Sequence, residues 1–279
     1  MYKILFTDID GTLTDSKGHI PKENEMAVKK LLEKGIKVVF CTGRNITGAL
    51  PVAKKLNITE PIICIDGILL CDIKNKKPVC DLKMDRKEAE AVIDVAKKYN
   101  VFAEVSNGYS YYKYIPKKEH RKFDFGNGHT IFDYIKGYFK GLRYLKSYES
   151  LKNVPGNLYQ VTIACGEDKF DVISEEIKNL GFDDIAVRNM LWKNYIFVNK
   201  KGADKARGIE ILCRKYGILP EEAVAIGDDM NDLKMLEYCG MGIAIKNSPD
   251  EVLKSADYIT DTDDNCGFAR ACEKFFDLD

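Results

Sequence analysis

One repeated pattern constrains the fold of this chain more than any other feature: a short, continuous apolar run ends in a polar residue and leads into a helix-like stretch. Such runs occupy residues 3–7, 37–41, 62–65 and 223–226, and amphipathic stretches occupy residues 21–34 and 204–216. Continuous apolar runs are typical of strands covered on both faces, as in parallel sheets. The alternation predicts a doubly wound parallel sheet of the α/β class, whose ligands bind at the carboxyl ends of the strands.

The pattern changes near residue 84. From there, helix-like stretches at residues 85–99 and 168–180 alternate with strand-like runs at residues 101–105, 109–115, 158–164 and 185–191. None of these runs ends in a group suited to catalysis. We therefore predict a discontinuous core, residues 1–83 and 191–279, interrupted by an inserted domain of helices and strands at residues 84–190.

Composition excludes several classes of protein. The chain has 43 Lys and Arg against 43 Asp and Glu, and this neutrality argues against a nucleic-acid or membrane partner. Its longest apolar stretch, residues 61–71, is far shorter than the roughly 20 residues that span a bilayer. The first residues lack the features of a signal peptide, which predicts a cytoplasmic protein. Nine Cys without a C-x-x-C pair and three scattered His favour neither disulfides nor a zinc site.

The strongest chemical signal follows the first apolar run, where Asp8 and Asp10 stand two residues apart in D-I-D-G-T. Two carboxylates at a strand end can have different roles: one attacks the substrate or binds a metal, and the other transfers protons. Gly11 permits the sharp turn that would aim both into one site. A solvated turn is the plain alternative, because Asp, Gly and Thr are ordinary loop residues.

Two more strand ends carry groups suited to anions. Thr42, Gly43 and Arg44 follow the second run, where a hydroxyl and exposed N–H groups can cradle an anion, although a Thr helix cap is more common. Lys205 opens a helix after the run at residues 195–199. Among carboxylates it can hold a phosphate oxygen and keep a nucleophilic Asp ionised, whereas a lone Lys is usually a solvated surface residue.

A further strand end is strongly acidic. Asp228, Asp229 and Asp232 lie within five residues after the run at residues 223–226, with Asn231 among them. Hard oxygen ligands of this kind suit Mg²⁺. An acidic helix N-terminus explains one such acid better than three. Together, the four strand ends indicate Mg²⁺-assisted phosphoryl chemistry through an aspartyl phosphate, while the absence of P-loop and G-x-G-x-x-G motifs leaves nucleotide sites unsupported.

These motifs, in this order and with a long insertion between the second and third, resemble those of the haloacid dehalogenase superfamily of phosphohydrolases, specifically the Cof-type class IIB branch. The resemblance covers nearly the whole chain. It implies a Rossmann-like core with an inserted α/β cap domain. It also implies a Mg²⁺-dependent phosphatase of small organic phosphomonoesters such as sugar phosphates.

The resemblance also implies a role for each motif residue. Asp8 would be the nucleophile, and Asp10 the general acid and base. Mg²⁺ would be held by the Asp8 carboxylate, the Asp10 carbonyl and Asp228, with Asp232 and Arg44 in support. The phosphate would contact five groups: the Ile9 backbone, Thr42, Gly43, Lys205 and Asn231.

Two positions do not follow directly from the family pattern. The family usually has Asn-Gly after the third strand, whereas this chain has Asp66 and Gly67, and an acid there could repel substrate or hydrogen-bond a sugar hydroxyl. Lys200 and Lys201 compete with Lys205 for the third motif, and the family spacing favours Lys205.

Alternative functions stay open at this point. A phosphomannomutase-like phosphotransferase would pass the phosphoryl group to a second sugar hydroxyl. A non-enzymatic receiver-type phosphoacceptor is disfavoured by the chain length and by Asp8 on the first strand. We expect a small phosphorylated metabolite as partner, and a monomer or weak homodimer. A basic stretch at residues 97–152, with Lys113, Lys117 and Arg121, could recruit that metabolite if it faces the site, or could be a half-buried strand and solvated loop.

Overall fold

The computed structural model describes residues 2–116, 141–190 and 194–278. The chain divides into two compact units. We call Met1–Cys80 with Asp204–Asp279 the core unit, and Asp81–Ala203 the inserted unit.

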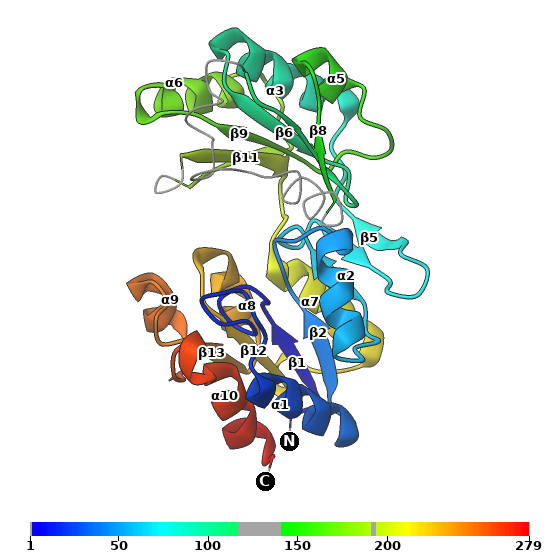
Figure 1. Cartoon of the computed structure of the whole chain (residues 1–279), viewed down its shortest axis with the longest axis vertical. Coiled ribbons are helices and arrows are strands. Elements are labelled where there is room, and N and C mark those ends of the chain that lie inside the picture. The colour runs from blue at the N-terminus through cyan, green and yellow to red at the C-terminus, as the bar shows by residue number, and fades with distance from the viewer. Residues whose placement is uncertain (1, 117–140, 191–193, 279) are drawn as a thin grey trace. The chain divides into compact units, whose positions relative to one another are not determined.

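A five-stranded parallel sheet in the order β14-β13-β12-β1-β2 organises the core unit (Figure 1). Its strands are β1 (Ile4–Thr7), β2 (Lys37–Phe40), β12 (Ala223–Gly227), β13 (Met241–Ala244) and β14 (Tyr258–Ile259). Every residue of β1 is buried, and β1 pairs in parallel with β12 on one side and β2 on the other. Three of the four continuous apolar runs, those at residues 3–7, 37–41 and 223–226, therefore form the predicted parallel strands, whereas the run at residues 62–65 does not join this sheet as a strand.

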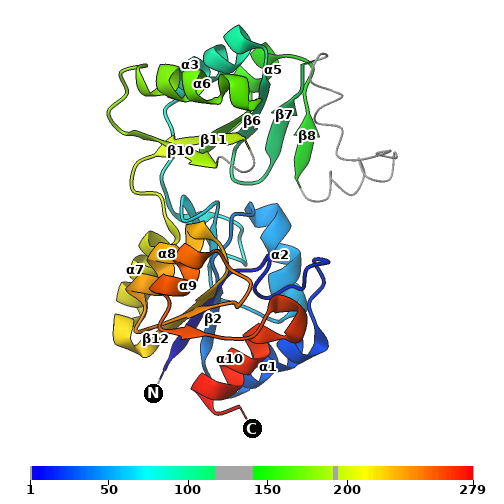
Figure 2. The same cartoon turned by 90° about the vertical axis from the view of Figure 1, so that its left-hand side faces the viewer.

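Helices cover both faces of this sheet. On one face α1 (Lys22–Glu33) packs beside α10 (Gly267–Phe276), and on the other α7 (Lys205–Tyr216) packs beside α8 (Leu233–Tyr238), as Figures 1 and 2 show. The remaining helical elements of the described core are α2 (Ile46–Lys55), α9 (Asp250–Ser255), η2 (Pro220–Glu222), η3 (Met230–Asp232) and η4 (Asp263–Asn265). The predicted doubly wound α/β core is confirmed.

A small second sheet in the core unit was not expected. β3 (Ile62–Cys64) lies beside β2 and pairs with the parallel sheet through an isolated bridge between Cys41 and Ile63. It also pairs with β4 (Leu69–Cys71), and β5 (Pro78–Asp81) follows in the order β3-β4-β5. The sequence indicated only the first of these strands, because β4 lies within the same apolar stretch as β3, at residues 61–71, and β5 begins with Pro78 and ends with Asp81.

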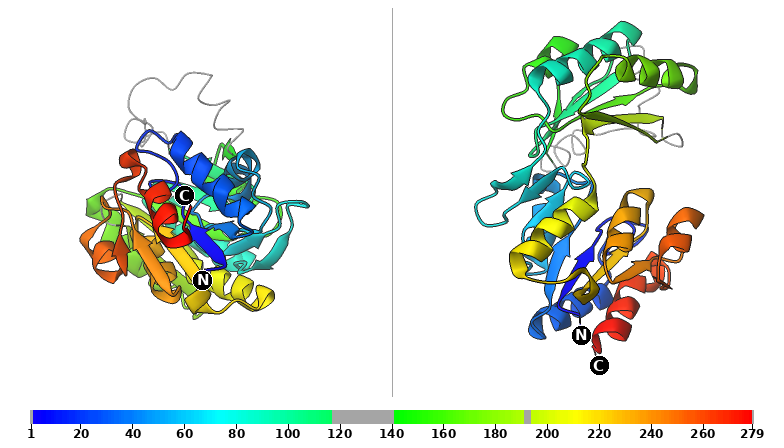
Figure 3. Two further views of the ribbon diagram at one scale, coloured as in Figure 1. Left: turned by 90° about the horizontal axis from the view of Figure 1, so that it is seen from below. Right: turned by 180° about the vertical axis from the view of Figure 1, so that it is seen from behind.

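The inserted unit is built on a six-stranded sheet in the order β10-β11-β9-β6-β7-β8. Its strands are β6 (Phe102–Ser106), β7 (Tyr111–Tyr114), β8 (Leu142–Tyr144), β9 (Gln160–Ala164), β10 (Ile185–Met190) and β11 (Tyr195–Lys200). Three helices pack on one face of this sheet, as the view from behind in Figure 3 also shows: α3 (Arg86–Tyr99), α5 (Tyr148–Lys152) and α6 (Glu167–Lys178). Helix α3 begins with a capping box, in which the N–H of Asp85 donates to Glu88 Oε2 at 2.8 Å.

The C-terminal boundary of the inserted unit differs from the expected one. The sequence assigned residues 191–279 to the core, but β11 pairs antiparallel with both β9 and β10. Ile196 and Val198 of β11 are fully buried in the hydrophobic core of this unit. The two units therefore divide after Ala203, and on the other side after Cys80 rather than residue 83.

The basic stretch of the inserted unit is only partly described. Lys113 on β7 forms an ion pair of 3.0 Å with Glu104 on β6, and both side chains are largely buried. Its charge is therefore neutralised within the unit. Lys117 and Arg121 lie outside the described residues.

None of the helices in the described ranges has the length and apolar character needed to cross a membrane.

A close contact between α7 and β3 gives a test of the core packing. A Cβ on Gly208 would lie 2.7–2.8 Å from three side-chain atoms of the fully buried Ile63. We expect Gly208→Ala to lower the free energy of unfolding by about 1–3 kcal/mol, because the added methyl overpacks the interface. Gly48→Ala is the control, since its nearest atom would be 3.5 Å away. Urea denaturation that ranks Gly208→Ala as no less stable than Gly48→Ala would contradict this packing.

Candidate active site

Polar side chains that the sequence singled out meet at one edge of the core sheet. Asp8 follows β1, Asp228 follows β12, and Thr42 follows β2 after one residue. Because these three strands are parallel neighbours, their carboxyl ends lie together. The N–H of Thr42 donates to the carbonyl of Ile63 at 2.8 Å, which brings β3 to the same edge.

Lys205, the first residue of α7, lies between two carboxylates at this edge. Its side chain is 0% exposed, and Nζ donates to Asp8 Oδ1 at 2.7 Å and to Asp232 Oδ1 at 2.6 Å. The position of α7 is set locally by Asp204, whose side chain caps the helix by accepting from the Arg207 N–H at 2.9 Å. An ion triad thus joins the ends of two strands to the start of a helix.

The structure also distinguishes among the three lysines considered for the third motif. Lys200 lies at the end of β11 in the inserted unit, where it pairs with Glu88 at 2.7 Å and with Asp184. Only Lys205 contacts Asp8 among the described lysines. The spacing argument from the sequence therefore selected the lysine that reaches the site.

Burial controls the charges of the triad. Burial raises the pKa of Asp8 well above its ordinary value, Lys205 opposes this, and Asp232 and Asp228 add to it. For Lys205, burial by itself lowers the pKa, but the carboxylates of Asp232, Asp8 and Asp66 outweigh it and the pKa is raised. Lys205 therefore remains a cation, while the surrounding acids exceed what one ammonium group can neutralise.

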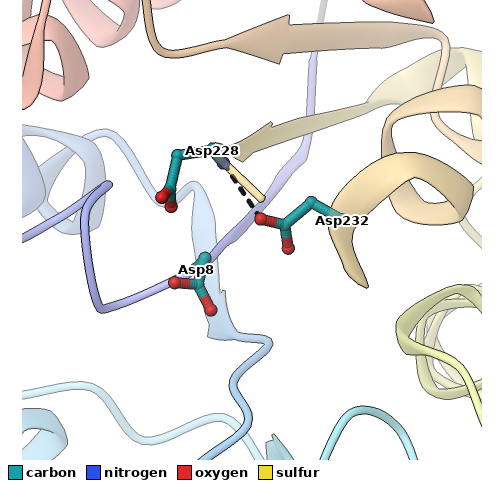
Figure 4. A group of neighbouring side chains, drawn as sticks. All are labelled: Asp8, Asp228 and Asp232. Atoms are coloured by element: carbon teal, nitrogen blue, oxygen red, sulfur yellow. Dashed lines mark hydrogen bonds between the residues drawn. The ribbon is translucent and has the colours of Figure 1, made fainter. Parts of the chain in front are cut away.

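Asp232 and Asp228 have different surroundings, although both lie close to Asp8 (Figure 4). Asp232 Oδ2 accepts the N–H groups of Asp228 and Asp229 at 2.9 and 3.0 Å, while its Oδ1 contacts Lys205. Asp232 thus holds the turn after β12 in place. Asp228 Oδ1 accepts only the hydroxyl of Thr12, at 2.6 Å, among the described residues.

The acids at this edge fit a divalent cation. Ligand oxygens of Asp8, Asp228 and Asp232 all lie within 4.8 Å of one another. Burial raises the pKa of Asp228 to about 7, partly offset by the Thr12 hydrogen bond and by Lys205, so a further cation here would favour its ionised form. An all-oxygen carboxylate set is what Mg²⁺ prefers. Because both oxygens of Asp232 are already hydrogen-bonded, Asp8 and Asp228 are the better ligands.

Asp10 lies apart from the buried triad. Its side chain is 58% exposed and forms a two-pronged ion pair with Arg44, in which Arg44 Nε donates to Oδ2 at 2.7 Å and Nη2 donates to Oδ1. A planar guanidinium fork suits this arrangement. The pair joins the first motif to the second, and it leaves Asp10 at the solvent side of the site.

The groups expected to contact phosphate lie near one another. Thr42 is fully buried, and its hydroxyl oxygen accepts from the Arg44 N–H at 3.1 Å, so that the hydroxyl hydrogen can donate elsewhere. Asn231 Nδ2 donates to Asp66 Oδ1 at 2.8 Å. A Cβ on Gly43 would lie 3.2 Å from that same oxygen. The second motif, the third strand end and the acidic turn therefore converge.

One contact escaped the sequence reasoning. Thr12 belongs to the first motif, yet no role followed from the pattern, whereas in the structure its hydroxyl donates to Asp228. Gly11 is explained by the same contact. Its φ is +81°, and a Cβ there would lie 2.4 Å from Asp228 Oδ2. Only glycine allows the first motif to approach the acidic turn so closely.

Fold and site together define an enzyme of the doubly wound α/β class with an acidic, oxygen-lined site at its strand ends. Comparison with known families makes this specific. The family model of haloacid dehalogenase-like hydrolases matches residues 5–272. The chain therefore belongs to the haloacid dehalogenase-like hydrolase family, as its motifs predicted.

Individual relatives agree with this assignment. The chain is 27% identical to the 5-amino-6-(5-phospho-D-ribitylamino)uracil phosphatase YcsE of Bacillus subtilis, over 96% of this chain and 94% of that one. A haloacid dehalogenase-like hydrolase from Bacteroides thetaiotaomicron has a TM-score of 0.82 at 25% identity, covering 99% and 100% of the two chains. A subclass IIB sugar phosphatase shares the fold, with a TM-score of 0.78 at 23% identity over 99% and 100%. The predicted assignment is confirmed at this level: an enzyme of the haloacid dehalogenase type whose relatives are named phosphatases.

The ion triad predicts a large stability effect at Lys205. We expect Lys205→Met to lower the free energy of unfolding by about 3 kcal/mol or more at pH 8, because it leaves Asp8 and Asp232 buried without a cation. The loss should shrink at pH 5.5. Burial already raises the pKa of Asp8, and loss of the opposing Lys205 charge raises it further, so the folded variant binds more protons than the unfolded chain and the destabilisation grows as pH rises.

Lys234→Met is the matched control for this substitution. Lys234 is exposed and pairs with Asp204 at 2.8 Å, so its replacement should cost less than about 1 kcal/mol. Denaturant unfolding of both variants at the two pH values measures the difference. Equal losses at pH 8 would show that Lys205 is no more important than a surface lysine.

Proposed function

We propose that the chain is a Mg²⁺-dependent phosphatase that hydrolyses small phosphomonoesters through an aspartyl phosphate on Asp8. The observation that carries this proposal is the contact between Asp8 Oδ1 and the buried Lys205, beside Asp228. A carboxylate in contact with an ammonium group is a suitable nucleophile for a phosphoryl group, because the cation favours the ionised form against the effect of burial. The names of the relatives, a ribitylaminouracil phosphatase and a sugar phosphatase, support a small phosphorylated metabolite as the substrate.

The first step forms a bond from an Asp8 oxygen to phosphorus and breaks the bond from phosphorus to the ester oxygen. Asp10, as a carboxylic acid, gives its proton to that leaving oxygen. For this, Asp10 must exchange its ion pair with Arg44 for the substrate, which its exposed position allows. Lys205, the Thr42 hydroxyl, Asn231 and the N–H groups of Ile9 and Gly43 are the groups that we assign to the phosphoryl oxygens.

The second step returns Asp8 to its starting state. Asp10, now a carboxylate, accepts a proton from water, whose oxygen attacks phosphorus as the bond to Asp8 breaks and inorganic phosphate forms. The residues fit a metal as well: Asp8, Asp228 and the carbonyl of Asp10 would hold Mg²⁺. When bound, Mg²⁺ neutralises charge on the phosphoryl group.

Replacement of the proposed nucleophile tests the mechanism. Asp8→Asn should lower kcat for p-nitrophenyl phosphate by at least about a thousandfold, because a neutral amide does not attack phosphorus. Glu33→Gln removes the same charge from an exposed residue at the C-terminal end of α1, which carries none of the proposed site residues, and should leave kcat unchanged. Phosphate release is measured after circular dichroism has verified folding. Substantial turnover by folded Asp8→Asn would reject Asp8 as the nucleophile.

The raised pKa of Asp228 predicts how pH affects Mg²⁺ binding. In the metal-free protein burial raises the pKa of this carboxyl to about 7, from the value of 3.8 that is ordinary for an exposed Asp and applies in the unfolded chain. Folding therefore takes up a proton between these values, and this group makes the metal-free fold less stable as pH rises through that window. At pH 6 Mg²⁺ must displace the proton, which should weaken its apparent affinity by about tenfold relative to pH 8.

Thermal unfolding measures this effect directly. The increase in Tm on adding Mg²⁺ should be larger at pH 8 than at pH 6. Asp228→Asn removes the titrating group and should abolish most of the increase at both values. An equal Mg²⁺-dependent increase in the native protein at pH 6 and pH 8 would contradict the assignment of Asp228 as a ligand.

A further inference from the structure

Asp66 brings an additional carboxylate to the groups that we assign to phosphate. It follows β3, and its Oδ1 accepts from Asn231 Nδ2 at 2.8 Å. The same oxygen lies against Gly43, at 3.2 Å from the position of a Cβ there. Asp66 is also among the carboxylates that raise the pKa of Lys205. Its charge therefore acts on the binding site itself.

The backbone holds Asp66 firmly in this place. Ile65, Asp66 and Gly67 have φ values of 50°, 52° and 88°, a run of left-handed residues that is unfavourable for a β-branched Ile. The loop is held by its N–H groups, since Ile65 donates to the Arg44 carbonyl at 3.1 Å and Asp66 to the Thr42 carbonyl at 3.2 Å. A Cβ on Gly67 would lie 1.7 Å from the Asp204 carbonyl, so the loop has no room to move toward α7.

A carboxylate and an amide would present different chemistry from this loop. An ionised carboxylate only accepts hydrogen bonds, whereas an Asn side chain also donates. Asp66 Oδ1 accepts a hydrogen bond from Asn231, whereas Oδ2 accepts none from the described residues. If Asn stood here with its carbonyl facing Asn231, an NH₂ group would replace Oδ2. An NH₂ group suits a phosphate oxygen, whereas Oδ2 suits a hydroxyl or a protonated amine.

Resting on the function proposed above, we infer that Asp66 is a specificity-determining residue. It selects phosphomonoesters that carry a hydroxyl or protonated amine beside the phosphoryl group. The donor of such a substrate hydrogen-bonds to Oδ2 and offsets the negative charge that Asp66 adds near the phosphate. Esters without a donor meet the same charge with no compensating contact.

A purely structural role for Asp66, that of fixing Asn231, makes a different prediction. Asp66→Asn keeps an acceptor for Asn231 Nδ2, and Asn adopts left-handed φ values about as readily as Asp. The substitution therefore retains the loop and the Asn231 contact, and changes only the charge and the group that faces the substrate. Asp66→Asn therefore distinguishes a role of Asp66 in substrate selection from a role in positioning Asn231.

Two substrates with one carbon skeleton provide the readout: glycerol 2-phosphate, with two hydroxyls beside the ester, and isopropyl phosphate, with none. We expect the native protein to prefer glycerol 2-phosphate in kcat/KM. Asp66→Asn should reduce the ratio by about tenfold or more, the range expected for losing a hydrogen bond to a charged group. Glu33→Gln should leave the ratio unchanged, because this exposed acid lies on α1 away from the strand ends.

A binding measurement tests the charge without turnover. Tungstate at pH 8 is a tetrahedral dianion with no hydrogen-bond donor. In the presence of Mg²⁺, calorimetry should show at least about threefold tighter tungstate binding to Asp66→Asn than to the native protein, because a like charge has been removed.

The outcomes distinguish this inference from the proposed function. If the native protein hydrolyses neither substrate nor p-nitrophenyl phosphate, the proposed function fails and the inference fails with it. If it hydrolyses them but Asp66→Asn leaves the ratio of kcat/KM values unchanged, only the inference about Asp66 is overturned. Tungstate affinity that does not rise in Asp66→Asn would overturn it as well.

Discussion

The buried ammonium group of Lys205 is the interaction on which the rest of the site depends. Removing a charge from water costs several kcal/mol, and Asp8 and Asp232 offset that cost by contacting the group on two sides. These contacts join the end of β1 to the start of α7 and to the turn after β12. Asp232 extends the linkage to the N–H groups of Asp228 and Asp229. One ion triad therefore determines where the other acids lie.

The triad also leaves the site richer in acids than in bases. Asp228 has its pKa raised to about 7 by burial, and Asp66 adds a further carboxylate near Lys205. Such a site can gain stability from a divalent cation and from substrates that bring hydrogen-bond donors. The distribution of carboxylates and the ammonium group at the strand ends, more than the shape of any one loop, thus connects the fold to the proposed chemistry.

Much of the core was predictable because its signals are local. The runs that became β1, β2 and β12 and the amphipathic stretches that became α1 and α7 each carry their pattern within a few residues. β13 and β14 were not predicted, because Gly242 interrupts the apolar run of β13 and β14 has only two residues. β11 shows a second limit. Its apolar run resembled another core strand, but its partners β9 and β10 place it in the inserted unit.

The family, the parallel core and the order of polar groups at its strand ends could all be read from the amino-acid sequence, because each is carried by residue types at short spacing. Which of these groups contact one another depends on the three-dimensional fold. It placed Asp232 on Lys205, Thr12 on Asp228, Arg44 on Asp10, and Asn231 on Asp66 across 165 residues of chain. These contacts join side chains from different elements, and their distances depend on strand order and helix placement, which no local pattern encodes.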